Sequence, residues 1–400
     1  MKRVAPSEIQ RFCKECLEVA GASPPHAASL ATVLAQADQM GYLSHGLNRL
    51  AIYVQDVQLK LADGAAMPSI IKETTATAWV DGKNALGPVV GNFCMDVAIQ
   101  KAKDCGIGWI VAKGSNQYGI GSWYSTQALK HNMLGMAFSN ASPMVPPTRS
   151  EKNAMGTNPL SVAAPAMDGD SFVLDMATST AAVGVSESTK KKKEKVPLQD
   201  MKDNHQPLGS IGSLSAPIRN LKLTHKKLSI EVKKTTKKPI PMAWAQVSDE
   251  KPKDIIAKLA WDIKDQMPLG GDEMNSGYKG YGLALMVETF CGILAGGDFG
   301  PNIREWTDDK RPANLAQCFV VINPANFAPG FEQRMSEMNG ILRNMEPLHP
   351  DKPVLVPGDS ERKYMEKVNK EGGVFYTEHQ LIVAAQLAAK LKVTPLKVLR

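Results

Sequence analysis

The sequence predicts a mixed α/β fold, in which a sheet-containing middle is flanked by helical segments at both ends of the chain. Apolar residues recur at helical spacing near both ends, whereas short β-rich runs alternate with helical runs between residues 70 and 180. With 400 residues, of which 43% are hydrophobic and 22% charged, the chain has the composition of an ordinary globular protein. We expect two or three subdomains.

The N-terminal segment is predicted to be helical. Residues 7–20 carry apolar side chains at helical spacing, with Ser7 as the N-cap and Gly21 as the stop. The same punctuation recurs between Ser23 and Gly41. Residues 1–70 are therefore expected to form a helical part.

The following part is predicted to contain a layered α/β arrangement. Four runs have strand character, namely 107–114, 134–143, 160–166 and 171–179. Two runs have helical character, namely 92–106 and 122–132. Their alternation indicates helices packed on a sheet, although periodicity does not fix the direction of a strand.

A basic segment interrupts this pattern between residues 189 and 238. It holds thirteen Lys and one Arg against four acids, a net charge of +10, whereas the whole chain carries +7 and the remainder therefore −3. Its lysine pairs and the low-complexity run "GSIGSLSAP" are typical of a solvated, disordered insertion. Because no aromatic residues interleave the lysine run 190–193, nucleic-acid binding is not expected.

Ordered structure is predicted to resume at residue 239. A long helix is expected over 277–297 and a strand over 318–324. Three helices are expected to complete the chain, around 328–345, 359–371 and 377–391.

The cysteines and the apolar runs exclude several classes of protein. The six cysteines form no disulfide framework, and the Cys13–Cys16 pair has no second pair or nearby histidine, so no metal site is expected. No apolar run is long enough to span a bilayer, and the first residues do not have the pattern of a secretory signal. We expect a cytoplasmic protein without membrane contact.

A glycine-rich stretch, "GSNQYGIGSWYS" at residues 114–125, lies between two apolar runs. It lacks the Gly-Lys-Ser/Thr ending of a Walker loop and the GxGxxG spacing of a Rossmann turn. No other stretch supplies GxGxxG. A dinucleotide would therefore have to be bound by a non-Rossmann fold.

The run "SHGLNRLAIYV" is predicted to be a helix capped by Ser44. His45, Arg49 and Tyr53 are spaced by four residues and would then project from one face. Arg offers a planar fork for a carboxylate, His exchanges protons near neutral pH, and Tyr donates a hydrogen bond. These residue types suit an acidic small molecule, although a solvated polar face explains the triplet equally well.

Several motifs together resemble the type-2 malate/L-lactate dehydrogenase family, which includes sulfolactate, ureidoglycolate and diketogulonate oxidoreductases. They occur in the order and approximate spacing of that family: "SHGLNR" with Tyr53, "KGSNQYGIGSWY", "SNASPMVPPTR", "MGTNPLS", "VLDMATS", "PLGG", and "GYKGYGLALMVE" followed by "CGILAGG". The similarity covers nearly the whole chain outside the basic segment. Each motif is weak alone, but their combination is highly specific.

The resemblance implies a homodimeric oxidoreductase that moves hydride between NAD or NADP and a small 2-oxo or 2-hydroxy acid. It implies catalytic roles for His45 and Gln117, and contacts to the substrate from Ser44, Arg49, Tyr53 and Asn158. The implied cofactor contacts are Asn140, Asp175, Met176, Ala177, Thr178, Lys279 and Gly280. The Lys279–Gly280 helix start also has the chemistry of a pyrophosphate site.

The family organisation implies five segments. Residues 1–70 would form the helical N-terminal part of the substrate and dimer domain, and residues 326–400 a C-terminal helical part packed on it. Residues 71–188 and 239–325 would form the NAD(P)-binding sheet domain, separated by the insertion at 189–238.

Two departures from the family pattern bear on activity. Gln117 occupies the position where relatives usually carry a catalytic histidine, and an amide cannot deliver a proton. Val185 replaces a lysine, and about forty extra residues precede "IPMAWA", where Met242 takes a glycine position. The alternative is therefore a catalytically impaired NAD(P)-binding protein on the same scaffold.

Overall fold

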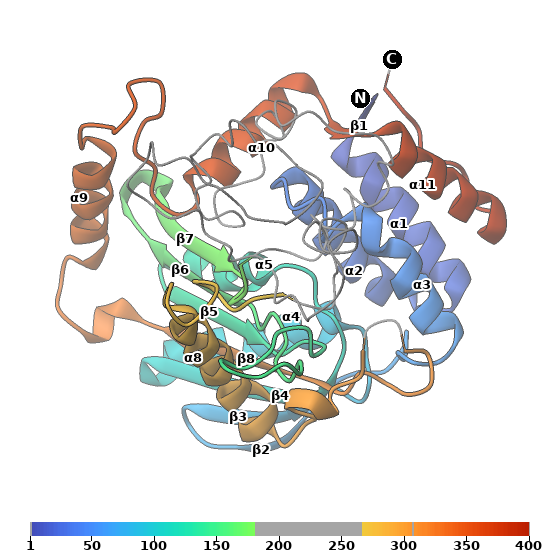
Figure 1. Ribbon diagram of the computed structural model, residues 1–400, viewed down its shortest axis with the longest axis horizontal. Coiled ribbons are helices and arrows are strands. Elements are labelled where there is room, and N and C mark those ends of the chain that lie inside the picture. Colours follow the sequence, from blue (N-terminus) through green and yellow to red (C-terminus); the bar gives the residue numbers. More distant parts are fainter. Residues whose placement is uncertain (1, 181–265, 306–307, 400) are drawn as a thin grey trace, which may run out of the picture.

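The computed structural model describes residues 2–180, 266–305 and 308–399 (Figure 1). The predicted insertion at 189–238, Val185 and the predicted return of order at residue 239 lie outside these ranges. Among the described residues, no helix is long and apolar enough to cross a membrane.

A seven-stranded mixed sheet forms the centre of the molecule, with the strand order β2-β3-β4-β8-β5-β6-β7. The strands are β2 (Ser69–Glu73), β3 (Thr77–Asp81), β4 (Ile107–Ser115), β5 (Leu134–Ser139), β6 (Leu160–Pro165), β7 (Ser171–Met176) and β8 (Leu315–Ile322). Only the β3–β4 pair is parallel, and the other five pairs are antiparallel. The predicted mixed α/β class is confirmed.

Side-chain alternation gives this sheet two apolar faces. In β4, Ile110 joins a core with α4 (Gly87–Cys105), and its neighbour Val111 joins a second core with α8 (Gly277–Glu288). The short α5 (Gly121–Ser125) and a 3-10 segment, Thr126–His131, lie on the α4 side. The sheet is therefore covered on both faces, which is consistent with the burial of nearly all of β8.

A separate helical core brings the two ends of the chain together. It contains side chains of α1 (Pro6–Ala20), α2 (Pro24–Gln39), α3 (Leu50–Gln58) and α11 (Glu378–Leu391). Strand β1 (Lys2–Val4) pairs antiparallel with β9 (Val374–Tyr376), so the termini lie side by side (Figure 1).

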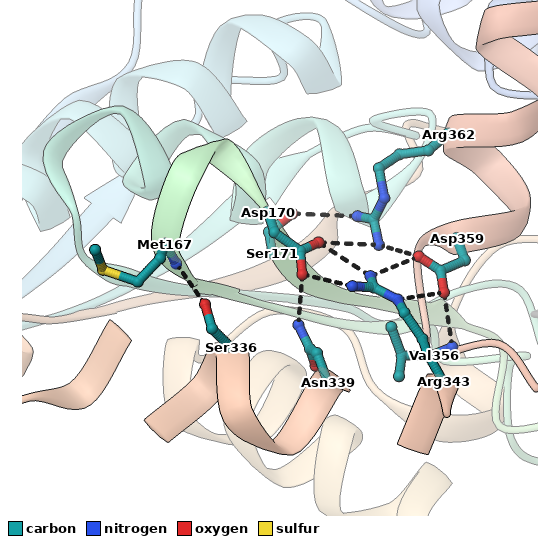
Figure 2. Close-up of polar contacts among 9 residues, drawn as sticks. All are labelled: Met167, Asp170, Ser171, Ser336, Asn339, Arg343, Val356, Asp359 and Arg362. Carbon is teal, nitrogen blue, oxygen red and sulfur yellow. Dashed lines mark hydrogen bonds and ion pairs between the residues drawn. The ribbon is translucent and has the colours of Figure 1, made fainter. Parts of the chain in front are cut away.

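Two further helices, α9 (Phe331–Arg343) and α10 (Asp359–Glu371), are tied to the β6–β7 turn by ion pairs between Arg and Asp side chains (Figure 2). Arg343 bonds Asp170 and Asp359, each at 2.7 Å, and Arg362 bonds Asp359 at 2.6 Å. Hydrogen bonding to Arg343 lowers the pKa of Asp170 to about 2. This network fixes α10, which carries one residue of the site described below.

Some predicted element ends differ from the structure. Helix α1 begins at Pro6 with Ala5 at its N-cap, so Ser7 lies inside the first turn and is not the cap. The predicted helix at 122–132 divides into α5 and the 3-10 segment. Proline favours the first helical turn, which explains the earlier start of α1.

Candidate functional site

The segment "SHG" forms a turn and not the predicted helix start. Ser44, His45 and Gly46 lie in the turn, a 3-10 helix covers Leu47–Arg49, and α3 begins only at Leu50. The prediction that Ser44 caps a helix bearing His45, Arg49 and Tyr53 on one face was therefore wrong. The backbone of the turn, and not a helix, therefore sets the direction of the His45 side chain.

His45 is held as a neutral imidazole beside a cation. Its Nδ1 lies 2.9 Å from the Ser44 hydroxyl, which fixes the orientation of the ring. Burial, together with the positive charge of Arg49, lowers the pKa of His45 to about 4. At neutral pH the His45 imidazole is therefore unprotonated, with a nitrogen lone pair available to a proton.

Arg49 and Tyr53 stay near His45 although they lie on different elements. Arg49 is 5% exposed and donates from Nε to the Ser44 carbonyl at 2.7 Å, which folds its side chain back over the turn. Burial raises the pKa of the buried Tyr53, whereas the charge of Arg49 lowers it. An imidazole, a guanidinium and a phenol therefore share one small region.

Gln117 lies in the loop that follows β4, among well-packed neighbours. Tyr118 and Tyr124 stack with their ring centroids 4.6 Å apart, and the Tyr124 hydroxyl donates to the Tyr118 carbonyl. Burial raises the pKa of Tyr124, and electrostatic interactions with Tyr118 and Tyr53 add to the rise, so α3 lies close to this loop. Gln117 itself is half-buried, beside the packed tyrosine pair.

The loop continues into α5, which packs against the end of β7. Asp175 accepts from the Ser122 backbone N–H at 2.7 Å. A Cβ at Gly121 would lie 2.8 Å from Ser161 Cβ, so only glycine allows this approach. Burial raises the pKa of Asp175 to about 6 in spite of the hydrogen bonds from Ser122.

The turn that carries His45 and the end of β7 lie close together within this chain. The Tyr42 hydroxyl donates to Glu361 of α10 at 2.9 Å. After burial, the negative charge of Asp175 is the next largest cause of the raised pKa of Tyr42. Tyr42 therefore connects the turn, Asp175 and α10 in one polar cluster.

The residues after β7 are fastened to the loop that precedes α8. Thr178 is fully buried, and its carbonyl accepts from the Leu269 N–H at 2.9 Å. Met176 and Ala177 are half-buried, and Lys279 is exposed on the first turn of α8. A Cβ at Gly280 would lie 2.3 Å from Leu269 N, so the α8 start packs directly on this loop.

Asn140 and Asn158 are drawn together by one buried carboxylate. Asn140 Nδ2 donates to Glu288 Oε1 at 3.0 Å, and Asn158 Nδ2 donates to Glu288 Oε2 at 2.9 Å. The Oδ1 atom of each amide accepts a backbone N–H. Both amides thus hold the ends of β5 and β6 against α8, and their contacts with ligands stay predictions.

Sequence reasoning missed Tyr42, Glu361, Glu288 and a buried acid of α2, Asp38. Glu288 and Asp38 could have been noticed as acids inside apolar helical runs, whereas Tyr42 and Glu361 are 319 positions apart. Within residues 2–180, 266–305 and 308–399, no group of three or more His, Cys, Asp or Glu side chains could hold a metal ion.

Comparison with known proteins gives consistent matches over most of the chain. The family model described as malate/L-lactate dehydrogenase matches residues 4–206 and 225–382. A malate dehydrogenase of Pyrococcus abyssi is 31% identical, with 87% of this chain and 84% of that protein aligned. A ureidoglycolate dehydrogenase (NAD(+)) of Escherichia coli K12 is 26% identical, with 92% and 91% aligned. The structure of malate dehydrogenase from Pyrococcus horikoshii OT3 superposes with a TM-score of 0.78 at 28% identity, covering 98% of this chain and 97% of the other.

Proposed function

Because this chain belongs to the malate/L-lactate dehydrogenase family, we propose that it moves a hydride between a nicotinamide dinucleotide and a small 2-oxo or 2-hydroxy acid. The observation that carries the proposal is that His45 and Arg49 both bond Ser44, which brings an imidazole and a guanidinium together near the end of β7. A guanidinium suits the substrate carboxylate, and a neutral imidazole suits the hydroxyl proton.

The residues between β7 and α8 have the chemistry that a dinucleotide requires. Half-buried Met176 and Ala177 offer apolar surface to a planar ring, and exposed Lys279 offers a cation to a phosphate. Gly280 and Thr178 bring the two backbone segments together around Leu269. We propose these residues, with Asp175, as the cofactor contacts, for NAD or NADP.

We assign proton movement to His45. A bound oxidised dinucleotide would supply the acceptor for the hydride at C2 of a 2-hydroxy acid. His45 takes the hydroxyl proton, and Arg49 holds the carboxylate. Pairing of Arg49 with that carboxylate removes one cause of the low pKa of His45, so substrate binding makes the imidazole a better base. The reverse steps reduce the 2-oxo acid.

Gln117 is assigned to orient the reacting oxygen through its amide. If relatives use a histidine at this position, Gln117→His tests whether this chain lacks an acid. General acid catalysis contributes about 10²- to 10⁴-fold, so a gain of that size would favour the alternative of an impaired, dinucleotide-binding protein. An unchanged rate would favour His45 as the sufficient proton carrier.

The decisive test is oxidation of NADH or NADPH with a panel of 2-oxo acids, including oxaloacetate and pyruvate. The expected result is turnover with at least one acid. A fluorescence titration of each dinucleotide measures binding separately. Binding without turnover at high enzyme concentration would contradict the proposed reaction, and absence of binding would contradict the scaffold assignment as well.

We also propose a homodimer whose second copy completes the substrate pocket. Light scattering measures the mass of the particle. If the pocket is shared, kcat/KM should fall as dilution shifts the mass toward the monomer, whereas a concentration-independent rate would argue against a shared pocket.

A further inference from the structure

We propose that Asp38 is a positioning residue that, together with Tyr376, fixes the turn carrying His45. This inference rests on the proposed function for its catalytic consequence. Its structural content, a carboxyl group that clamps the turn, can be tested without any turnover.

Asp38 bonds the turn and the C-terminal strand through one oxygen. Its Oδ2 accepts from the Leu47 backbone N–H at 2.8 Å and from the Tyr376 hydroxyl at 2.5 Å. Asp38 and Tyr376 are both 0% exposed. A strand near the end of the chain therefore helps to hold a turn near its beginning, with Asp38 of α2 between them.

The second carboxyl oxygen, Oδ1, packs against the backbone of the turn without a hydrogen bond. A Cβ at Gly46 would lie 1.9 Å from Asp38 Oδ1, so the turn backbone lies directly against the carboxyl group. Oδ1 is buried and has no hydrogen-bond partner among the described residues. The carboxyl group thus fixes Leu47 by a bond and Gly46 by contact, on the C-terminal side of His45.

The surroundings of Asp38 indicate that it acts through its position and not through a negative charge. Burial raises the pKa of Asp38 to about 7, although the bonds from Tyr376 and Leu47 oppose this shift. The titratable groups that face Asp38 are Cys13 of α1, Tyr364 of α10 and Tyr376 of β9, and burial raises the pKa of each. A proton on Oδ1 leaves Oδ2 free to accept both bonds, so the clamp does not require the charge.

An amide can therefore replace the carboxyl group, whereas a methyl group cannot. Asp38→Asn keeps an oxygen acceptor for Leu47 and Tyr376, and Asp38→Ala removes it and opens space beneath the turn. Tyr376→Phe keeps the buried ring and removes one donor. Asp170→Asn is the control for lost stability, because Asp170 joins the β6–β7 turn to α9 and α10 and makes no bond to Leu47 or Tyr376 (Figure 2).

The experiment measures hydrogen exchange at the Leu47 amide, dinucleotide affinity and 2-oxo acid turnover for the full chain. We expect Asp38→Ala to speed exchange at Leu47 at least tenfold and to lower kcat/KM about 10²-fold, as misplaced catalytic groups do. Tyr376→Phe should show smaller changes of the same sign. Asp38→Asn should stay within about threefold of the wild type, and dinucleotide affinity should not change.

If Asp38→Ala fails to fold, Tyr376→Phe and Asp38→Asn still allow hydrogen exchange at the Leu47 amide to be compared with the wild type. Unchanged Leu47 exchange in Asp38→Ala or in Tyr376→Phe, or losses no larger than in Asp170→Asn, would overturn the positioning role. If the wild type shows no turnover, the proposed function fails, and Leu47 exchange alone decides whether Asp38 clamps the turn.

Discussion

His45 gives a kinetic prediction at the scale of a single residue. Because its pKa is lowered to about 4, the imidazole of the free enzyme is neutral at every pH above about 5. We expect the His45 limb of kcat/KM for 2-hydroxy acid oxidation to lie below pH 5. A pH–rate profile measures this limb. Because the pKa of Asp175 is raised to about 6, a limb near pH 6.5 would show an ordinary pKa of His45 only if that limb disappears in His45→Gln.

Replacing the imidazole gives the companion prediction. His45→Gln keeps a hydrogen-bonding side chain but cannot carry a proton, so kcat should fall about 10²- to 10⁴-fold. Dinucleotide affinity, measured by fluorescence, should remain that of the wild type. Equal turnover in the variant and the wild type would transfer the proton role to another group.

Glu288 gives a stability prediction at the same scale. Its two oxygens accept from Asn140, Asn158 and the Gly300 N–H, and the side chain is 2% exposed. Glu288→Gln turns an acceptor into a donor that faces an amide donor. The free energy of unfolding should fall by about 1–3 kcal/mol in urea titrations. The exposed Glu366→Gln is the control and should change it by less than about 0.5 kcal/mol.

Some residues of the candidate site could be identified from the sequence, and others could not. His45 and Arg49 were identifiable because an imidazole and a guanidinium lie four positions apart within a motif. Asp38 and Glu288 were not, because their importance comes from burial and from partners such as Tyr376, which is 338 positions away from Asp38. A single sequence does not record such pairings.

Helix α8 gives a prediction at the scale of elements, with an internal control. Gly280 faces Leu269 so closely that a Cβ would lie 2.3 Å from backbone atoms, whereas a Cβ at Gly282 would meet nothing within 4 Å. Gly280→Ala should cost about 1–3 kcal/mol of stability and weaken dinucleotide binding. Gly282→Ala should raise stability by up to about 1 kcal/mol through helix propensity.

Thermal unfolding and fluorescence titration of both variants measure these effects. If Gly280→Ala were as stable as Gly282→Ala and bound dinucleotide equally well, the close contact between α8 and the loop at Leu269 would be unnecessary.

At this scale the sequence predicted helices better than turns and pairings. The predicted runs at 359–371 and 377–391 match α10 and α11 closely, because amphipathic spacing and capping are local signals. The turn at His45 was misread as a helix because Asp38 of α2 fixes it through contacts with Gly46 and Leu47, which helical spacing does not record. In the sheet, β8 lies between β4 and β5, so strands about 200 residues apart in the sequence are paired. Periodicity does not predict such pairing.

At the scale of the whole molecule, a buried ion pair connects the helical core to the sheet. Arg304 Nη2 lies 3.4 Å from Asp56 Oδ2 of α3, and their side chains are 2% and 12% exposed. The Arg304 carbonyl also accepts from Ser142 Oγ at 2.8 Å, in the loop after β5. Because α3 also carries Tyr53, this pair helps to set the distance between the proposed substrate contacts and the sheet.

Removing one member of this pair should therefore be costly. Arg304→Met leaves the buried Asp56 carboxyl without its cation, which typically costs about 3–5 kcal/mol. Burial already raises the pKa of Asp56 although Arg304 opposes it, and the pKa should rise further in the variant.

A raised carboxyl pKa stabilises the folded state at low pH, and this contribution is lost as the pH increases through that pKa. The deficit of Arg304→Met should consequently be small near pH 4 and grow toward pH 7. Urea titrations at pH 4 and pH 7 measure this loss of unfolding free energy, with Arg304→Met/Asp56→Leu as the matched double variant. A deficit that does not change with pH, and that the double variant does not relieve, would show that Arg304 acts through packing and not through its charge.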